Sequence, residues 1–242
     1  MKHLFERPKL IMEEFIIAGK PVSILSKEEI DLEINQAIVE RRKINFEGKS
    51  LKFLSLAEKD IGTGINMDNC WVAGNVFLGD ATINGDISMV NATIDGSFFF
   101  GRGKIMGSLD LEKIKVGQTM NMVGLNITGS LHLNQARVNG FVSLAKAVIL
   151  GDIDMRGIEL YDYNKDTLTV KGDIYLKSAQ INGFFDISDA SISGMVSLEN
   201  ALVRRSLIAR NLKVTDMLYL KNCIFNLDTA NLSGTEPDKI VR

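Results

Sequence analysis

The chain has 242 residues, of which 45% are hydrophobic and 24% charged, and its net charge is −2 at neutral pH. This composition is ordinary for a globular chain, so it excludes intrinsic disorder. The near balance of acidic and basic residues excludes an overall basic surface, and we therefore expect no direct binding of nucleic acid.

The sequence also indicates the cellular compartment of the protein. Residues 1–20 include acidic side chains and lack the continuous apolar core of a signal peptide. No stretch approaches the roughly 20 apolar residues of a membrane-spanning helix, so we expect no membrane span. The two cysteines, Cys70 and Cys223, share one small position of a repeat but lie far apart along it, which favours reduced thiols over a disulfide. These features predict a cytoplasmic protein.

Residues 1–48 are predicted to form a helical amino-terminal cap. Residues 10–16 fit a short amphipathic helix that Gly19 would end, and residues 22–24 are typical of a brief extended segment. Ser26 and Glu29 have the spacing of a capping box, which predicts a second helix after Ser26. Its apolar face would hold Ile30, Ile34, Ala37 and Ile38. We expect this face to cover the open end of the domain that follows. A separate partner-binding helix is the alternative.

From residue 49 to residue 223 the chain repeats a pattern of eleven residues. Two clear copies are residues 82–92 (TINGDISMVNA) and residues 180–190 (QINGFFDISDA). The second position is Ile, Val or Leu, the fourth is often Gly, the sixth and eighth are apolar, and the eleventh is mostly Ala. A period sustained over most of a chain predicts a solenoid.

The spacing of the apolar positions predicts the shape of the coil. The sixth and eighth positions are two residues apart, as are the eleventh and the second of the next unit, so each pair points to one side of an extended segment. Two units then close a four-sided coil of 22 residues, and about eight coils spaced by ~4.8 Å make a rod about 38 Å long. Gly at the fourth position is expected to supply a positive φ in the longer corner. Only the first unit, with Ser50 at its second position, departs from the pattern.

A small Ala is followed two positions later by a larger apolar residue around all four predicted sides. The pairs that show this are Ala81-x-Ile83, Ala92-x-Ile94, Ala136-x-Val138, Ala190-x-Ile192 and Ala201-x-Val203. This alternation resembles the pentapeptide-repeat proteins, although every second five-residue step here has six residues. The resemblance covers nearly the whole chain from residue 49 and implies a right-handed quadrilateral β-helix.

The expected fold is therefore an all-β solenoid, a right-handed four-sided β-helix of about eight 22-residue coils with a short helical amino-terminal cap. The expected parts are a cap at residues 1–48, the repeat domain at residues 49–223, and a carboxy-terminal cap or flexible tail at residues 224–242. The resemblance implies little about activity, because a fold does not carry a function.

One unit, residues 159–168, has ten residues and puts Asn164 and Asp166 at inward positions. A dry core cannot take these side chains cheaply, so we expect the unit to loop outward before Val170 restores the register. Asp162, Asn164 and Asp166 alternate as the ligands of calcium loops do, which makes them a weak metal candidate. Because Thr167 stands where such loops have Gly, a solvated loop is the favoured interpretation.

Aromatic residues recur at outward positions of the repeat. Phe141, Tyr163 and Phe184 share the fifth position and are expected to lie one above another, and Phe77 and Phe99 share the seventh position on the same side. A column of exposed aromatics is more apolar than a monomer needs, which suggests a lateral or dimer contact. The favoured interpretation is nonetheless that other segments cover the column or that each ring is an isolated surface aromatic, and the lateral or dimer contact is the alternative.

Charge is uneven along the predicted rod. Residues 60–101 contain five acids and no Lys or Arg, whereas residues 202–223 contain five bases and one acid. We favour solvated faces as the explanation, and head-to-tail contact between copies is the alternative.

The sequence offers little support for catalysis. It has no P-loop, GxSxG or CxxC motif, and its two histidines, His3 and His132, are fewer than the three that a zinc site of the β-helix carbonic anhydrases needs. Asp152 and Asp154 form a pair of carboxylates, but no cleft is evident around them. We expect no enzyme, no cofactor and no metal.

Three functions remain open at this point. The favoured one is a non-catalytic scaffold that binds protein, including its own copies, through the surface of the β-helix. The resemblance implies a second, a DNA mimic that binds a type II topoisomerase, although the repeat nearly balances its charge. An uncharacterised enzyme is the third.

Overall fold

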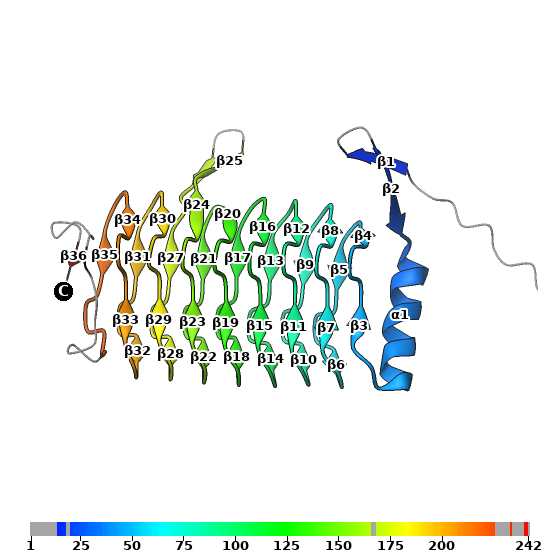
Figure 1. The fold of residues 1–242 in the computed structure, drawn as a ribbon, viewed down its shortest axis with the longest axis horizontal. Coiled ribbons are helices and arrows are strands. Elements are labelled where there is room, and N and C mark those ends of the chain that lie inside the picture. Colours follow the sequence, from blue (N-terminus) through cyan, green and yellow to red (C-terminus); the bar gives the residue numbers. More distant parts are fainter. Residues whose placement is uncertain (1–13, 18–19, 166–167, 226–232, 234–239, 242) are drawn as a thin grey trace, which may run out of the picture.

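The computed structural model describes residues 14–17, 20–165, 168–225, 233 and 240–241. Its main body is a β-solenoid of about nine turns, in which every rung crosses four parallel sheets in succession (Figure 1). Paired residues are 22 apart in most of the stack, as in the pairs Thr82–Lys104 and Ile87–Leu109. The predicted four-sided solenoid with 22-residue coils is confirmed.

We name each sheet by its number of strands in the described part of the chain. The ten-stranded sheet contains β1 (Glu14–Ile17), β2 (Lys20–Leu25), β4 (Ser50–Leu51), β8 (Trp71–Val72), β12 (Thr93–Ile94), β16 (Lys115–Val116), β20 (Arg137–Asn139), β24 (Glu159–Tyr161), β30 (Ser191–Ile192) and β34 (Lys213–Val214). The nine-stranded sheet contains β5 (Leu54–Ser55), β9 (Val76–Phe77), β13 (Phe98–Phe99), β17 (Met120–Asn121), β21 (Val142–Ser143), β27 (Ile174–Tyr175), β31 (Val196–Ser197), β35 (Leu218–Tyr219) and β36 (Ile240–Val241).

The other two sheets complete each rung. The eight-stranded sheet contains β3 (Ile44–Asn45), β7 (Ile65–Asn66), β11 (Ile87–Ser88), β15 (Leu109–Asp110), β19 (Leu131–His132), β23 (Ile153–Asp154), β29 (Phe185–Asp186) and β33 (Leu207–Ile208). The seven-stranded sheet contains β6 (Asp60–Ile61), β10 (Thr82–Ile83), β14 (Lys104–Ile105), β18 (Asn126–Ile127), β22 (Val148–Ile149), β28 (Gln180–Ile181) and β32 (Leu202–Val203).

The core is filled from four positions of each unit, as the periodicity predicts. In the unit 82–92 these are Ile83, Ile87, Met89 and Ala92, and each is at most 1% exposed. Their neighbours point outward because side chains alternate along extended backbone. Burying a large apolar side chain contributes about 1.5–3 kcal/mol, so a core repeated in every rung stabilises the whole rod.

The left-handed residue of each unit is its tenth rather than its fourth. Residues at the tenth position have φ near +57°, and Asn or Asp often occupies it, as in Asn91 and Asp189. Short polar side chains tolerate this conformation better than most others do. The predicted positive φ at the fourth-position Gly is wrong in nearly every unit, and Gly140 is the exception.

Close packing between rungs explains the fourth-position glycines instead. The Gly151 amide donates to the Gly129 carbonyl oxygen at 2.9 Å, so the two corners touch. A Cβ on Gly151 would lie 2.6 Å from that same oxygen. Glycine is required there because stacked corners leave no room for a side chain.

The solenoid begins earlier than the expected boundary at residue 49. Ile44 and Phe46 are fully buried, and β3 pairs with β7 in the eight-stranded sheet. Leu51, not Ser50, occupies the second position of the next unit, because Leu51 is buried and pairs with Val72. The apparent departure at Ser50 is therefore a unit that is one residue short in its corner.

The predicted excursion from the rod is present, but its bounds differ from those expected at residues 159–168: Glu159–Tyr161 stays in the ten-stranded sheet as β24, and the insertion begins after Tyr161 and ends before Gly172. β25 (Tyr163–Lys165) and β26 (Leu168–Val170) form an antiparallel hairpin that projects from the solenoid (Figure 1). Val170 does not restore the register, since it pairs with Tyr163 inside the hairpin. The rung resumes at Gly172, and Ile153 pairs with Phe185 across the extra residues.

The amino-terminal segment differs in part from the sequence prediction. Residues 14–17 form β1, which pairs antiparallel with β2, so the helix predicted at residues 10–16 is wrong for the part that the structure describes. Aromatic and β-branched residues such as Phe15 and Ile16 favour a strand once a sheet edge is at hand, and a helix this short is marginal. The extended segment at residues 22–24 is confirmed within β2, which pairs with β4.

Helix α1 (Lys27–Glu40) lies across the end of the rod (Figure 1). The predicted capping box is present: the Glu29 amide donates to Ser26 Oγ at 3.2 Å, and the Ser26 amide donates to Glu29 Oε2 at 2.8 Å. On its inner face, Ala37 is fully buried, and Ile30 and Ile34 pack against the core. Ile38, expected on the same face, is exposed.

Glu33 fixes the helix to the first rung. Its carboxylate accepts two hydrogen bonds from the Arg42 guanidinium and a third from the Asn45 amide at 2.8 Å. The Arg42 hydrogen bond lowers the pKa of Glu33 below its ordinary value of 4.5. This carboxylate joins α1, the turn after it and β3 at a single point.

At the other end, β36 pairs with β35, and Leu202 bridges to Ile224. Within the described residues, α1 is the sole helix, and it is too short and too polar to cross a membrane.

Candidate interaction face

One side of the rod differs from the other three in its outward side chains. On the nine-stranded sheet, the fifth and seventh positions of each unit flank the buried sixth position and point outward. We call the residues at these positions the nine-strand face: Phe53, Ser55, Asn75, Phe77, Ser97, Phe99, Thr119, Asn121, Phe141, Ser143, Asp173, Tyr175, Met195, Ser197, Met217 and Tyr219.

This face presents no exposed charged side chain. Its single carboxylic acid is Asp173, which is 6% exposed. The Asp173 carboxylate accepts hydrogen bonds from the Met195 amide at 2.7 Å and from the Tyr175 hydroxyl at 2.6 Å. Each of the other sides carries exposed charge in its strands or beside them, for example Asp60, Asp86 and Lys115. On the nine-stranded sheet, exposed charge such as Lys177 and Lys221 lies in the corner that follows the strands. Outward strand positions free of exposed charge on every rung are not explained by the repeat, which constrains inward positions.

Aromatic side chains occupy several outward positions of the nine-strand face, where the other sides carry charged residues. Phe77 and Phe99 stack on adjacent rungs with ring centroids 5.2 Å apart and planes 5° from parallel. Phe141 packs edge-on against Tyr175 at 6.2 Å. Burial, together with the hydrogen bond to Asp173, raises the pKa of Tyr175 to about 12, so its hydroxyl stays neutral. The predicted alignment of Phe77 with Phe99, on the same side as Phe141, is confirmed.

The predicted column of Phe141, Tyr163 and Phe184 is wrong. Phe141 precedes β21 in the nine-stranded sheet, whereas Phe184 precedes β29 in the eight-stranded sheet. The hairpin inserts nearly one unit, so counting units through it assigns Phe184 to the wrong side. The Phe184 ring instead lies beneath the Arg205 guanidinium at 5.4 Å. Tyr163 belongs to β25, and its side chain lies outside the description.

Three aromatic members of the face were not predicted: Phe53, Tyr175 and Tyr219. Tyr175 and Tyr219 occupy the seventh position, as Phe77 and Phe99 do, once the inserted hairpin is removed from the count. Phe53 follows the shortened corner of the first complete unit. The seventh-position column was therefore the feature in the sequence that could have revealed the two tyrosines.

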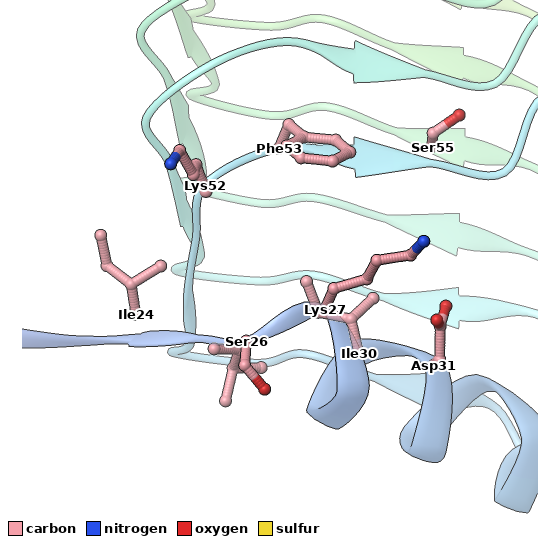
Figure 2. A pocket seen from close by; sticks show the side chains of 9 residues that line it. Ile24, Ser26, Lys27, Ile30, Asp31, Lys52, Phe53 and Ser55 are labelled. Atoms are coloured by element: carbon pink, nitrogen blue, oxygen red, sulfur yellow. The ribbon is translucent and has the colours of Figure 1, made fainter. Parts of the chain in front are cut away.

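At its amino-terminal end the face runs into a pocket of about 590 Å³ between α1 and the first rung (Figure 2). Ile24, Leu25, Ile30 and Phe53 supply its apolar lining. Ser26, Lys27, Asp31, Lys52 and Ser55 supply its polar groups. Phe53 is 48% exposed, so its ring is available to a bound group. The pocket has the size and lining to accept an apolar side chain with a polar tip.

The weak metal candidate receives no support from the residues that are described. Asp162 Oδ1 accepts hydrogen bonds from the Ser193 hydroxyl at 2.7 Å and from the Gly172 amide at 3.1 Å, so it closes the base of the hairpin. The Ser193 hydrogen bond lowers the pKa of Asp162. The side chain of Asn164, and Asp166 as a whole, lie outside the description. Across the described residues, no group of three metal-ligating side chains comes together.

The paired carboxylates of Asp152 and Asp154 bind donors within the rod. Asp152 Oδ1 accepts from the Phe184 amide at 2.8 Å, and Asp154 forms an ion pair with Arg156 at 2.6 Å. His132 lies between Asp110 and Asp154 in an outward column of the eight-stranded sheet. These groups are spread along a flat side of the rod, and each carboxylate of the pair already holds a protein donor.

The two cysteines are free thiols, Cys70 buried and Cys223 half-buried. Burial raises the pKa of Cys70 to about 12 and that of Cys223 to about 11. Both are therefore poor nucleophiles near neutral pH.

Comparison with known proteins adds no relative to this description. No family model, no curated protein and no solved structure matches the chain.

Proposed function

We propose that this protein is a non-catalytic structural module that binds protein through the nine-strand face. The observation that carries the proposal is the absence of exposed charge on that face, in the described chain, while the other sides are charged. Charged residues are depleted and aromatic residues are enriched in the centres of protein interfaces. An exposed aromatic strip along a water-soluble rod is costly unless a partner covers it.

The pocket between α1 and the first rung supports the same proposal. It lies at the end of the aromatic strip, and Phe53 belongs to both. An interface gains most of its affinity from a few anchors that fill pockets, surrounded by near-neutral contacts. The nine-strand face offers a flat contact area with one such pocket at its end.

The arrangement of the acidic residues weighs against the DNA-mimic function. The acids of the stretch from Asp60 to Asp95 lie on different sides and corners of the rod. Asp60 starts a strand of the seven-stranded sheet, Asp86 adjoins the eight-stranded sheet, and Asp95 accepts from the Trp71 indole beside the ten-stranded sheet. Mimicry of a phosphate backbone needs a continuous acidic face.

Two finer assignments belong to the proposal. The four-sided rung with two-residue strands supports membership of a variant of the pentapeptide-repeat family. The two unpaired thiols support a cytoplasmic location, because reducing compartments keep cysteines free.

The test is capture of partners by the purified protein from native lysate, with two variants for comparison. The double variant Phe77→Ser/Phe99→Ser removes the stacked pair from the nine-strand face. Phe184→Ser is the matched control, because Phe184 is 39% exposed, close to the 37% of Phe77, but lies on another side. We expect the double variant to lose proteins that the wild type and the control retain. Equal capture by all three proteins would remove the nine-strand face from consideration.

A further inference from the structure

We infer that the partner of the nine-strand face is a second copy of this chain, which packs against it side to side with the two rods aligned along their length. The inference rests on the proposed function of that face and names its occupant.

Described segments of the chain lie over part of each end of the rod, which favours contact through the sides. Helix α1 packs its buried face onto the first rungs, with Ala37 in the core. At the far end, β36 occupies the edge of β35 in the nine-stranded sheet, and Ile224 bridges to Leu202 at the edge of the seven-stranded sheet. A free sheet edge is the usual route by which solenoids add copies end to end, and covering it blocks that route.

A second copy matches this face at every rung. Outward side chains recur along the rod at the spacing of neighbouring strands, about 4.8 Å. A partner with a different period would meet the face in register at only a few points. A copy of the same rod has the same period, so contacts made at one rung are repeated at the next. Closed two-fold pairing of one surface with itself is also the commonest way in which soluble chains associate.

The charge distribution selects this side for self-pairing. In a two-fold contact each face meets its own copy, so exposed charges of one sign risk like-charge contacts across the interface. The ten-stranded sheet, with Lys115 and Arg137 exposed on adjacent rungs, would meet this cost. The nine-strand face avoids it, because its one acid, Asp173, is buried and satisfied by Tyr175 and Met195.

The area of the face indicates the expected affinity of the dimer. Eight rungs span about 38 Å, and four extended residues give a side about 13 Å wide. Two such faces together cover roughly 1,000 Å², near the lower limit for a specific interface. We therefore expect a reversible dimer with a Kd in the micromolar range.

Sedimentation velocity over about 1–200 µM, a range that brackets micromolar affinity, tests the inference on the full chain. The wild type and Phe184→Ser should convert from monomer to dimer as concentration rises. Phe77→Ser/Phe99→Ser should raise the Kd at least about tenfold, a loss typical of interface anchors. Circular dichroism checks that each variant retains the β-solenoid.

A second pair of variants tests the face by adding a charge, without removing an aromatic ring. Ser197→Glu adds a charge to the nine-strand face, and Ser191→Glu adds the same charge to an exposed position of the ten-stranded sheet. Ser197→Glu should weaken the dimer and Ser191→Glu should not. A monomer at every concentration, or a dimer indifferent to the changes at Phe77, Phe99 and Ser197, would overturn the inference. If the protein is monomeric but lysate capture still depends on Phe77 and Phe99, self-pairing is wrong and the proposed function stands.

Discussion

Phe77 and Phe99 lie on adjacent rungs of the nine-stranded sheet, with their ring centroids 5.2 Å apart and their planes within 5° of parallel. Their backbones pair directly, so the stack follows from the 22-residue period. Phe77 remains 37% exposed, while the core beneath it is filled by residues such as Val76 and Phe98. Changes at these two rings therefore probe binding rather than the integrity of the rod.

The hairpin is an addition to the rod, and removing it should leave the rod folded. Deleting residues 162–171 joins Tyr161 directly to Gly172 and restores the 22-residue step. The change loses the contacts of Asp162 with Ser193 and of Lys171 with Asp216, which lie on the surface, and exposed contacts of this kind add little to stability. We expect thermal unfolding to show a Tm within about 5 °C of the wild type.

An equally long deletion elsewhere supplies the control. Removing residues 152–161 takes out core side chains, among them Ile153, Met155 and Leu160. That variant should fail to fold. If the 162–171 deletion also abolishes the cooperative transition, the hairpin is part of the solenoid and the interpretation as an insertion is wrong.

The fourth-position glycines should be intolerant of a methyl group. At Gly151 an added Cβ would meet the Gly129 carbonyl oxygen at 2.6 Å, so Gly151→Ala should destabilise by about 2 kcal/mol through overpacking. Gly62→Ala is the matched control, since nothing lies within 4 Å of its added Cβ and its φ is not positive. Urea denaturation of both variants gives the comparison, and equal midpoints would contradict close packing of the corners.

The core and the shape of the rod could be predicted from the sequence because they depend on inward positions. Ile83, Ile87, Met89 and Ala92 are all buried, as the spacing of two residues requires. The role of the fourth-position glycines could not be predicted in the same way. A side chain is excluded at these positions by the corners of neighbouring rungs, which are 22 residues away in the sequence. Rules for local turns do not include such contacts.

The candidate face was predictable only in part. Phe77 and Phe99 follow from the period alone, but Phe184 was assigned to the wrong side. The insertion is only one residue shorter than a unit, so in the sequence it is indistinguishable from a unit. Val170 adds to this ambiguity, because it is an apolar residue at the place where the second position of a unit is expected. Only the backbone pairing of Tyr163 with Val170 reveals that this segment has left the rod.

Anchoring of α1 should depend on pH through Glu33. The folded pKa of Glu33 is lowered, chiefly by the hydrogen bond from Arg42, so its contribution to stability is present above its ordinary pKa of 4.5 and is lost as pH falls through the folded pKa. Glu33→Gln should therefore cost about 1–2 kcal/mol at pH 7, a value typical of hydrogen bonds to a charged group.

Chemical denaturation from pH 7 to pH 3 measures this difference. The gap between wild type and Glu33→Gln should narrow as pH falls below about 4.5. Glu40→Gln, which removes the more exposed partner of Arg42, should have a smaller effect at every pH. A gap that stays constant with pH would show that the ionised carboxylate is not what holds the helix.

Thiol labelling checks the burial of the inward column. Because burial raises the pKa of Cys70 to about 12 and that of Cys223 to about 11, little thiolate exists at pH 8 in the folded protein. We expect Cys70 to resist an aromatic disulfide reagent and Cys223 to react slowly, with both reacting rapidly once the chain is denatured. Fast labelling of Cys70 in the native protein would contradict its place in the core.

The central claim, that the nine-strand face is covered by protein, is tested most directly by photo-crosslinking in the intact cell. A benzophenone amino acid replaces Phe99 in one variant and Phe184 in another, so that the same group is placed on two sides of one rod. The account predicts covalent protein adducts from position 99 and few or none from position 184. Equal yields from the two positions, or adducts from position 184 alone, would contradict it.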